Sequence, residues 1–355
     1  MWTLTLHMSV IMAFYVNADV VGSGWRNRRI WLTGIGTLNV RGEAVLKLAL
    51  IEDYRPAVLG SGGLVEFGAL VPRVMDLPGH LRMTALIEQW DEYRDLVAEA
   101  ASRTTGIPGA RLRAPVPRPG KLLCAMLSFR EGITDAVLHP AFFLKSSSSV
   151  IGPGDTVELN PVDAAVFHHE AELAVVIGKH SKAVTAAEAL DSVFGYTCFM
   201  DLSARGVGPG TAFQDKSYDT FGPMGPWIVT ADEIIDPHAL RVKLWVNEEL
   251  RHDYPMNDIG NPIPDMIAYA SSIAGLDPGD VLAMGVNHQG IGPIQDGDTV
   301  RIEISEIGDF SVSVHDPLRR RWERGIDVGT AKAIRDMVRK IPLSAPVQFA
   351  RRLDR

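Results

Sequence analysis

The sequence predicts a mixed, strand-rich α+β protein. Short apolar runs of β-type residues follow one another after residue 120, and turn signals separate them, whereas segments with helical periodicity are few. The 355 residues are 46% hydrophobic and 22% charged, which suits a globular chain with one large or two unequal domains.

The leader, residues 1–45, differs from the remainder of the chain because its apolar residues show no sustained period. We expect it to be disordered or outside the fold. Its apolar start has no basic segment before it and no small-residue cleavage site after it, and His7 and Ser9 interrupt it. We therefore expect neither a signal peptide nor a membrane anchor, and no membrane partner.

The folded body is expected to begin near residue 46. Its first residues, KLALIEDYRPAVL, predict two strands joined by a turn at Glu52–Pro56. Apolar residues at helical spacing then predict a helix over 84–101. The segment PVPRPG (115–120) marks a domain boundary, because proline cannot continue a helix or a central strand.

Beyond this boundary the chain is predominantly β-type, with helices expected only over 263–274 and 331–341. The predicted strands lie at 121–127, 141–145, 172–178, 193–200, 226–230, 239–247 and 298–314.

Charge and cysteine content limit the partners and the compartment. The chain has 43 acidic residues against 35 Lys plus Arg, a formal net charge of −8, and lacks a basic stripe with interleaved aromatics, so we expect no nucleic-acid partner. Cys124 and Cys198 both lie in apolar runs. We expect buried free thiols and a reducing, cytoplasmic setting.

Two carboxylates stand one residue apart at the start of an apolar run in HHEAELAVVIG (168–178). On a strand, Glu170 and Glu172 point to the same face, where like charges repel each other and lose hydration. Either one of them is protonated, or both reach water, or a cation lies between them.

Asp201 follows a second apolar run, in FGYTCFMDLSAR (194–205). A carboxylate at a strand end is well placed to meet a ligand. Three carboxylates with open coordination positions suit a hard cation, Mg²⁺, Mn²⁺ or Ca²⁺, whereas zinc would require His or Cys ligands at a suitable spacing. We expect His168 and His169 beside the cation rather than on it.

Three segments together resemble the fumarylacetoacetate hydrolase family. They are HHEAELAVVIGK, FGYTCFMDLSAR and KSYDTFGPMGPWIVT (216–230), in this order. The family pattern is E-x-E-L-x-x-V-I-G, then G-Y-T with D-x-S-A-R, then K-S-x-D-T-x-G-P-x-G-P-W. The likeness spans roughly residues 46–318, and the combination is highly specific.

The resemblance implies a C-terminal catalytic domain with the family's β-roll or pseudo-barrel over 120–318, after a small N-terminal α/β domain over 46–114. The protein would be a homodimer. Beyond the likeness, the amphipathic run at 331–341 predicts that residues 319–355 form a helical tail. A divalent ion, usually Mg²⁺, would be bound by the three carboxylates already described, Glu170, Glu172 and Asp201.

The resemblance also assigns pocket residues. Lys216 matches the family's active-site lysine, and Lys145, in FFLK, matches a position that faces the pocket. The segment GPMGP (222–226) offers rigid backbone amides near the site, so Gly225 is a candidate substrate-binding residue. Arg205 is a further candidate, although a role in holding Asp201 or the fold fits its position better.

The expected lid histidine is missing. Hydrolytic relatives carry a histidine in a segment resembling N-Y-x-x-H after the first core strand, whereas this chain has LSFREG (127–132), which places Gly132 there. Glu131 or His139 is a candidate catalytic base in its place, since a shielded carboxylate can have a raised pKa. Either residue can equally be an ordinary surface residue.

The segment MGVNHQGIG (284–292) is a second departure, because it carries an extra residue relative to the family text. Asn287, His288 and Gln289 can reach the pocket and change specificity, with His288 as a candidate substrate-binding residue. A loop histidine without a function is the alternative.

These observations support an Mg-dependent enzyme that acts on a small oxo-acid or 1,3-dicarbonyl through a metal-bound enolate, with C–C hydrolysis as the family default. Because the lid histidine is absent, decarboxylation, tautomerisation, isomerisation or dehydration of an oxo-acid is the alternative. A non-catalytic metal-binding protein with this fold is a second alternative.

Overall fold

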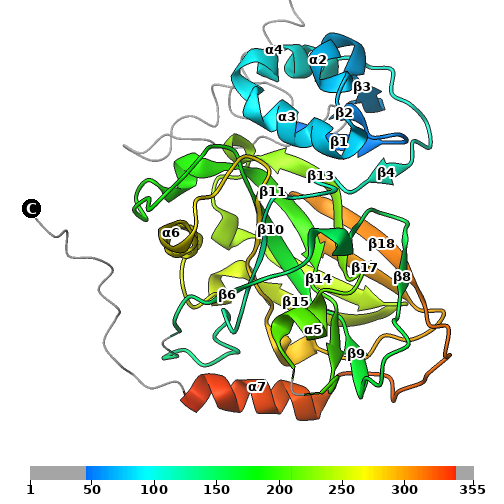
Figure 1. The fold of residues 1–355 in the computed structure, drawn as a ribbon, viewed down its shortest axis with the longest axis vertical. Coiled ribbons are helices and arrows are strands. Elements are labelled where there is room, and N and C mark those ends of the chain that lie inside the picture. Colours follow the sequence, from blue (N-terminus) through cyan, green and yellow to red (C-terminus); the bar gives the residue numbers. More distant parts are fainter. Residues whose placement is uncertain (1–44, 137, 209, 341–355) are drawn as a thin grey trace, which may run out of the picture.

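The computed structural model describes residues 45–136, 138–208 and 210–340. The expected leader lies outside these residues apart from Val45. Figure 1 shows a small layer of helices and strands above a larger strand-rich body, with the last helix along the opposite end. Within the described ranges, every helix is too short or too polar to cross a membrane.

The N-terminal elements begin with a hairpin of β1 (Lys47–Ile51) and β2 (Arg55–Gly60), as the sequence predicts. Glu52 and Tyr54 make the turn at positive φ, 46° and 61°. Strand β3 (Gly63–Glu66) continues the sheet, and α2 (Pro72–Met75), α3 (Arg82–Glu88) and α4 (Trp90–Ala101) cover it.

The single helix expected over 84–101 is instead two helices. Gln89 leaves the helical conformation, with φ −110° and ψ 25°, and lies between α3 and α4. The break directs Trp90 toward the body, where its ring meets Phe194 edge-on at 5.1 Å between centroids. Periodicity alone did not show this break because apolar spacing continues across it.

The largest sheet has 11 described strands in the order β3-β2-β1-β13-β11-β10-β16-β5-β6, with β4 beside β1 and β7 beside β13. Its members in the body are β4 (Leu112–Arg113), β5 (Leu122–Ala125), β6 (Phe142–Leu144), β7 (Val150–Ile151), β10 (Ala171–Ile177), β11 (Val193–Met200), β13 (Gly222–Thr230) and β16 (Val281–Ala283).

A second sheet has the order β15-β14-β17-β18-β8, and a third pairs β12 with β9. Their bounds are β8 (Thr156–Glu158), β9 (Val166–His168), β12 (Ser203–Arg205), β14 (Arg241–Val246), β15 (Glu249–Pro255), β17 (Thr299–Ile304) and β18 (Gly308–His315). Among the described strands, the pairing does not close into one barrel. The predicted mixed, strand-rich fold class is confirmed.

Strand β10 separates two hydrophobic cores. Leu173, Val175 and Ile177 face a core shared with the second sheet, whereas Ala174 and Val176 face a core shared with α3 and α4. This alternation is the two-residue period of a strand. It explains why β10 is apolar throughout: both of its faces are buried.

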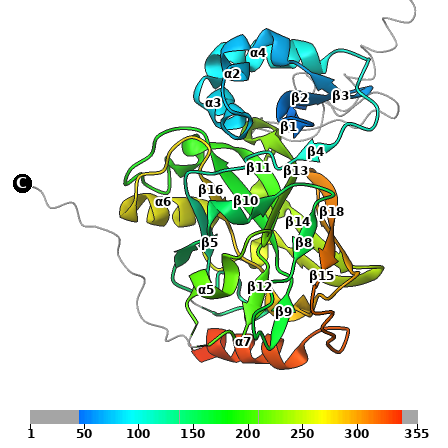
Figure 2. The ribbon, with the colours of Figure 1, turned by 45° about the vertical axis from the view of Figure 1, so that its right-hand side comes forward.

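Three further helices belong to the body: α5 (Ala212–Lys216), α6 (Ile263–Ile273) and α7 (Val328–Lys340). The helices expected over 263–274 and 331–341 are thus confirmed, although α7 begins three residues earlier. Figure 2 shows α7 beneath β9 and β12.

The boundary between 46–114 and 120–318 stays a prediction. Strand β1 pairs with β13 of the body, Leu48 opposite Ile228, and both residues belong to the same core. The N-terminal elements therefore share hydrogen bonds and apolar contacts with the sheet that carries the site.

Truncation of Leu48 tests this shared core. Leu48 is fully buried, so Leu48→Ala should lower the free energy of unfolding by about 2–5 kcal/mol in one cooperative urea transition. The exposed Leu81 is the matched control. Leu81→Ala should change the free energy of unfolding by less than about 0.5 kcal/mol. An early partial transition confined to the N-terminal elements in Leu48→Ala would contradict the shared core.

Candidate active site

Antiparallel pairing of β10 with β11 brings the three predicted carboxylates together. Ala171 pairs with Met200, and the amide of Asp201 donates to the carbonyl of Glu170 at 3.0 Å. One oxygen from each of Glu170, Glu172 and Asp201 lies within 4.8 Å of the others. All three side chains are buried, so their mutual repulsion is only weakly screened by water.

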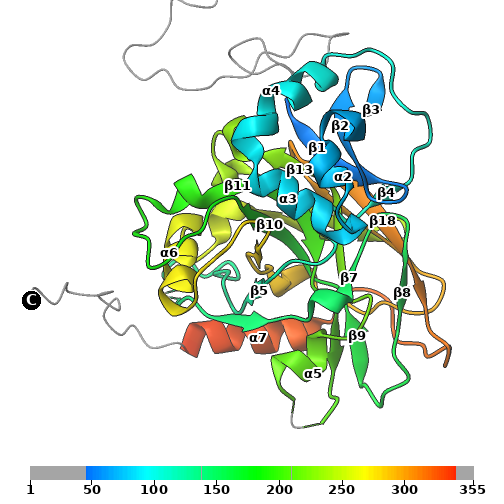
Figure 3. The same cartoon turned by 45° about the horizontal axis from the view of Figure 1, so that its top comes forward.

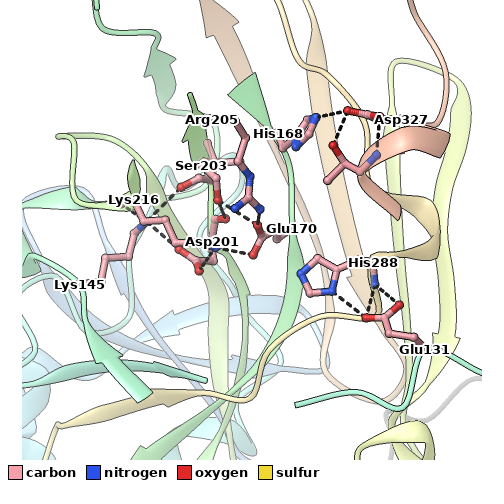
Figure 4. Close-up of polar contacts among 12 residues, drawn as sticks. Glu131, Lys145, His168, Glu170, Asp201, Ser203, Arg205, Lys216, His288 and Asp327 are labelled. Atoms are coloured by element: carbon pink, nitrogen blue, oxygen red, sulfur yellow. Dashed lines mark hydrogen bonds and ion pairs between the residues drawn. The ribbon is translucent and has the colours of Figure 1, made fainter. Parts of the chain in front are cut away.

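Two lysines lie against these carboxylates. The ammonium of Lys216, at the end of α5, is 2.6 Å from Glu170 Oε2 and 2.7 Å from Asp201 Oδ2. Lys145, just after β6, donates to Asp201 Oδ1 at 2.8 Å and to the carbonyls of Leu202 and Lys216. Figure 4 shows both ammonium groups pointing at the acidic cluster from the same side.

Strand β12 supplies two further contacts to Glu170. Arg205 Nη2 and the hydroxyl of Ser203 donate to Glu170 Oε1 at 2.5 and 2.9 Å. Arg205, a predicted substrate-binding residue, thus binds a glutamate of the cluster rather than Asp201. Ser203 was not among the predicted site residues, although its hydroxyl lies in the D-x-S-A-R motif that carries Asp201 and Arg205.

The two glutamates have opposite electrostatic environments. Burial alone would raise the pKa of Glu170, but the charges of Lys216 and Arg205 outweigh it and hold that pKa far below its usual range. Burial, together with the charges of Asp201 and Glu170, raises the pKa of Glu172 well above its usual range. The metal-free cluster therefore favours a proton on Glu172.

The donor set fits a hard divalent cation. Glu172 Oε2 accepts from the amide of Gly285 at 2.8 Å, whereas Glu172 Oε1 is buried with no hydrogen-bond partner among the described residues. An orphaned carboxylate oxygen beside two other carboxylates is a coordination position for an oxygen-preferring ion. Glu170, Glu172 and Asp201 are the residues that would hold it.

Glu131 and His288 form a buried pair on the other side of the cluster. The carboxylate of Glu131 accepts from His288 Nδ1 at 2.7 Å, from the amide of His288 at 3.0 Å and from Gln289 Nε2 at 2.9 Å. His288 begins the short 3₁₀ helix η8 (His288–Gly290). In Figure 4 its imidazole lies between Glu131 and the carboxylates.

Three further histidines surround this region. His168 and His169 precede Glu170, and the ring of His252 meets that of His169 edge-on at 5.0 Å between centroids. Burial lowers the pKa of both His252 and His168 to about 4, and it lowers the pKa of His169 well below its usual range. All three side chains are therefore neutral at pH 7.

The structure does not bring every candidate to the cluster. His139 lies in the loop before β6, and within the described residues no hydrogen bond or ion pair links it to the carboxylates or lysines. Gly225 lies inside β13, and its carbonyl accepts from the hydroxyl of Thr197. Neither position supports the expected role as directly as His288 does.

One further contact was not foreseen from the sequence. Asp327 Oδ2, just before α7, lies 3.1 Å from His168 Nε2. The signal available was its place ahead of the helical run that begins at Val328, which is typical of a helix cap rather than of a site residue.

Comparison with known proteins places these residues in a recognised domain. The model for the fumarylacetoacetate hydrolase C-terminal domain matches residues 125–315. A maleylpyruvate hydrolase of Aquipseudomonas alcaligenes is 34% identical over 58% of this chain and 75% of its own length. A mitochondrial oxaloacetate tautomerase of Rattus norvegicus is 36% identical over 70% of this chain and 82% of its own.

A solved relative carries a metal and an oxo-acid. The maleylpyruvate hydrolase from Sphingobium sp. SYK-6, in complex with manganese(II) and pyruvate, is 36% identical to this chain. It matches 76% of this chain and 99% of its own, with a TM-score of 0.69. A divalent ion and a small oxo-acid are therefore both accommodated by a protein of closely similar fold.

Cation binding should release a proton. Because the pKa of Glu172 is raised, a bound ion must displace its proton, so Mn²⁺ affinity should rise with increasing pH. Calorimetry in buffers of different ionisation enthalpy measures this release. Asp201→Asn should weaken Mn²⁺ binding at least about tenfold, whereas the control Asp219→Asn, at an exposed acid near Lys216, should not. A pH-independent affinity would show that Glu172 is already ionised.

Buried His252 should make stability fall in mild acid. Its pKa is lowered to about 4 from 6.5, so the unfolded chain takes up a proton across this window while the folded chain does not. The free energy of unfolding should therefore drop by on the order of 3 kcal/mol for this residue as pH falls from about 7 to about 4. Urea titrations of His252→Gln should show a shallower pH slope than wild type. The exposed His80→Gln is the control and should keep the wild-type slope.

Proposed function

The chain belongs to the fumarylacetoacetate hydrolase family, and on that premise we propose that it is a divalent-metal-dependent enzyme that hydrolyses a C–C bond of a small acylpyruvate-type oxo-acid. The observation that carries the proposal is the buried Glu131–His288 pair beside the acidic cluster. This pair provides a catalytic base in place of the lid histidine that this chain lacks.

The cation's contribution is electrostatic. An ion held by Glu170, Glu172 and Asp201 would polarise the adjacent oxygens of an oxo-acid and favour its enolate. We propose Mg²⁺ as the resident ion and Mn²⁺ as a functional substitute, because both prefer oxygen ligands.

Lys216 supplies positive charge to the same place. Burial opposes its charge, but Asp201 and Glu170 outweigh burial and raise its pKa, so the group stays an ammonium. A permanently protonated lysine stabilises negative charge on a substrate oxygen and does not act as a base. Lys145 donates to the other oxygen of Asp201 and holds that carboxylate in place.

His288 is the group suited to move a proton. Glu131 fixes Nδ1 as a donor, which leaves the other ring nitrogen to accept a proton on the side of the carboxylates. Glu131 itself is occupied by three donors, so its role is to orient the imidazole, as in other carboxylate–histidine pairs. For hydrolysis, His288 would take a proton from water and return it to the carbon that leaves.

Keto–enol tautomerisation of oxaloacetate is the second candidate. It needs enolate stabilisation and one proton transfer but no activated water, and the same lysine and histidine meet both needs. The similarity to an oxaloacetate tautomerase over 70% of this chain favours it.

We propose a reducing compartment and a homodimer for the enzyme. Cys124 and Cys198 are both buried free thiols, which agrees with a reducing compartment such as the cytoplasm. Edge strand β6 ends the large sheet, and Leu144 on it is 59% exposed. This edge supports the expected homodimer.

Substitution of His288 tests the proposal. With saturating Mn²⁺, His288→Ala should lower kcat for pyruvate release from maleylpyruvate by about 10²- to 10⁴-fold and leave Mn²⁺ affinity within a few fold, because the base but not the cation site is removed. Glu131→Gln should cost less, since it keeps a side chain beside Nδ1. Mass detection of products and enol absorbance of oxaloacetate separate hydrolysis from tautomerisation.

His139→Ala decides between His139, one of the two bases predicted from the sequence, and His288, the base proposed from the structure. It should retain wild-type turnover, because within the described residues no hydrogen bond or ion pair links His139 to the carboxylates or lysines. Loss of turnover in His139→Ala with retention in His288→Ala would overturn the assignment. Absence of turnover of either oxo-acid by the wild-type protein would reject both enzymatic candidates.

A further inference from the structure

The segment after the family domain contacts two loops that flank the active site. Strand β18 ends at His315, where the match to the family model also ends, and residues 316–327, here named the C-terminal strap, lead to α7. Figures 1 and 2 both place α7 at the end of the body that holds β9.

The first part of the strap is fixed to the loop before β9. Asp316 accepts from the amide and Nε of Arg320 at 2.8 and 2.9 Å. The guanidinium of Arg320 then donates to the carbonyls of Val162 and Asn160 at 2.7 and 2.9 Å and lies 4.7 Å from the ring centroid of Phe167. The strap is thereby attached to the chain that leads into His168.

The middle of the strap contacts the loop beyond η8. The amide of Trp322 donates to Gln295 Oε1 at 2.9 Å, and its indole donates to the carbonyl of Ala165 at 2.6 Å. Arg251 Nη1 donates to the carbonyl of Gly325. A side chain at Gly292 would collide with that same carbonyl, so strap and loop are in direct contact.

Asp327 joins the two sides of the active site. Its amide donates to the carbonyl of Ile291 at 2.8 Å, three residues after His288. Its Oδ2 lies 3.1 Å from His168 Nε2, two residues before Glu170, and Figure 4 shows this contact beside Glu170. One residue thus contacts both β9, which ends two residues before Glu170, and the loop of the acid–base pair.

A helix cap alone does not require these contacts. Asp327 caps α7 by accepting from the amide and hydroxyl of Thr330 at 2.9 and 2.8 Å. The helix itself packs on η8 through its buried face, which includes Ala331, Ile334 and Val338. The cap therefore orients a helix that lies against the loop of His288.

We propose that Asp327 is a positioning residue that holds the His288 loop at a fixed separation from the acidic cluster. This proposal rests on the proposed function for its kinetic consequence. Its structural part, that the contact with His168 restrains the loop, stands independently. The carboxylates and lysines are held by the sheet and α5, so cation binding should not depend on the strap.

Asp327→Ser tests the proposal in the full-length chain. Serine is a good helix cap but is too short to reach His168. Because the polar interaction between strap and strand is then absent, hydrogen exchange of the peptide covering 286–292 should quicken about tenfold. With Mn²⁺, kcat for oxaloacetate or maleylpyruvate should fall about tenfold with little change in KM or in Mn²⁺ affinity.

Two further variants separate positioning from simple stabilisation. Thr330→Ala removes the hydroxyl that donates to the cap but keeps Asp327 beside His168, and it should leave exchange and kcat unchanged. Asp327→Asn keeps the size and the cap, and its amide can donate to neutral His168, so it should restore most of the protection and turnover.

The outcomes are distinct. The proposal is overturned if residues 286–292 of Asp327→Ser exchange at the wild-type rate, or if Thr330→Ala loses as much protection and kcat as Asp327→Ser. A loss of Mn²⁺ affinity in Asp327→Ser that matches its loss of kcat would also overturn it. If the wild-type protein turns over neither oxo-acid, the proposed function fails, and the exchange measurement still decides whether the strap restrains the loop.

Discussion

The constraint on which the structure depends is the burial of three carboxylates at one point of a sheet. In a setting with little water, Glu170, Glu172 and Asp201 repel one another strongly, and the fold must supply compensating charge. Lys216, Lys145 and Arg205 supply it from three separate elements. The remaining imbalance falls on Glu172, where either a proton or a cation must be bound.

This constraint explains why the neighbouring elements are placed as they are. Strand β12 returns beside β9 so that Arg205 and Ser203 reach Glu170, and the short helix α5 ends at Lys216, which bridges Glu170 and Asp201. The capping box of α5, formed by Thr211 and Gln214, fixes the start of that helix. Cationic side chains are thus delivered by elements whose own conformations are independently restrained.

Local patterns in the sequence predicted the acidic cluster because strand period and strand ends are properties of short segments. Glu170 and Glu172 share a face by that period, and Asp201 follows the strand that pairs with theirs. The pairing of Glu131 with His288 spans 157 residues and depends on the conformation of a 3₁₀ turn, so no short segment encodes it. Likewise, the interruption at Gln89 divided a helix whose apolar period was continuous. Glu131 and His288 were both expected in the pocket, but as base and substrate ligand rather than as partners.

The cation ligands and the proton-transferring imidazole belong to different parts of the fold, and this separation affects how new activities can arise. The cation ligands lie on or beside β10 and β11, and their lysines lie at the ends of α5 and β6, whereas the imidazole is carried by a 3₁₀ turn. A substitution or insertion in residues 286–292, beyond Gly285 whose amide binds Glu172, can therefore alter reaction type while the ion remains bound. Protein engineers can treat the two as separate modules: graft a different turn, retain the ion, and select for new chemistry on the same class of acids.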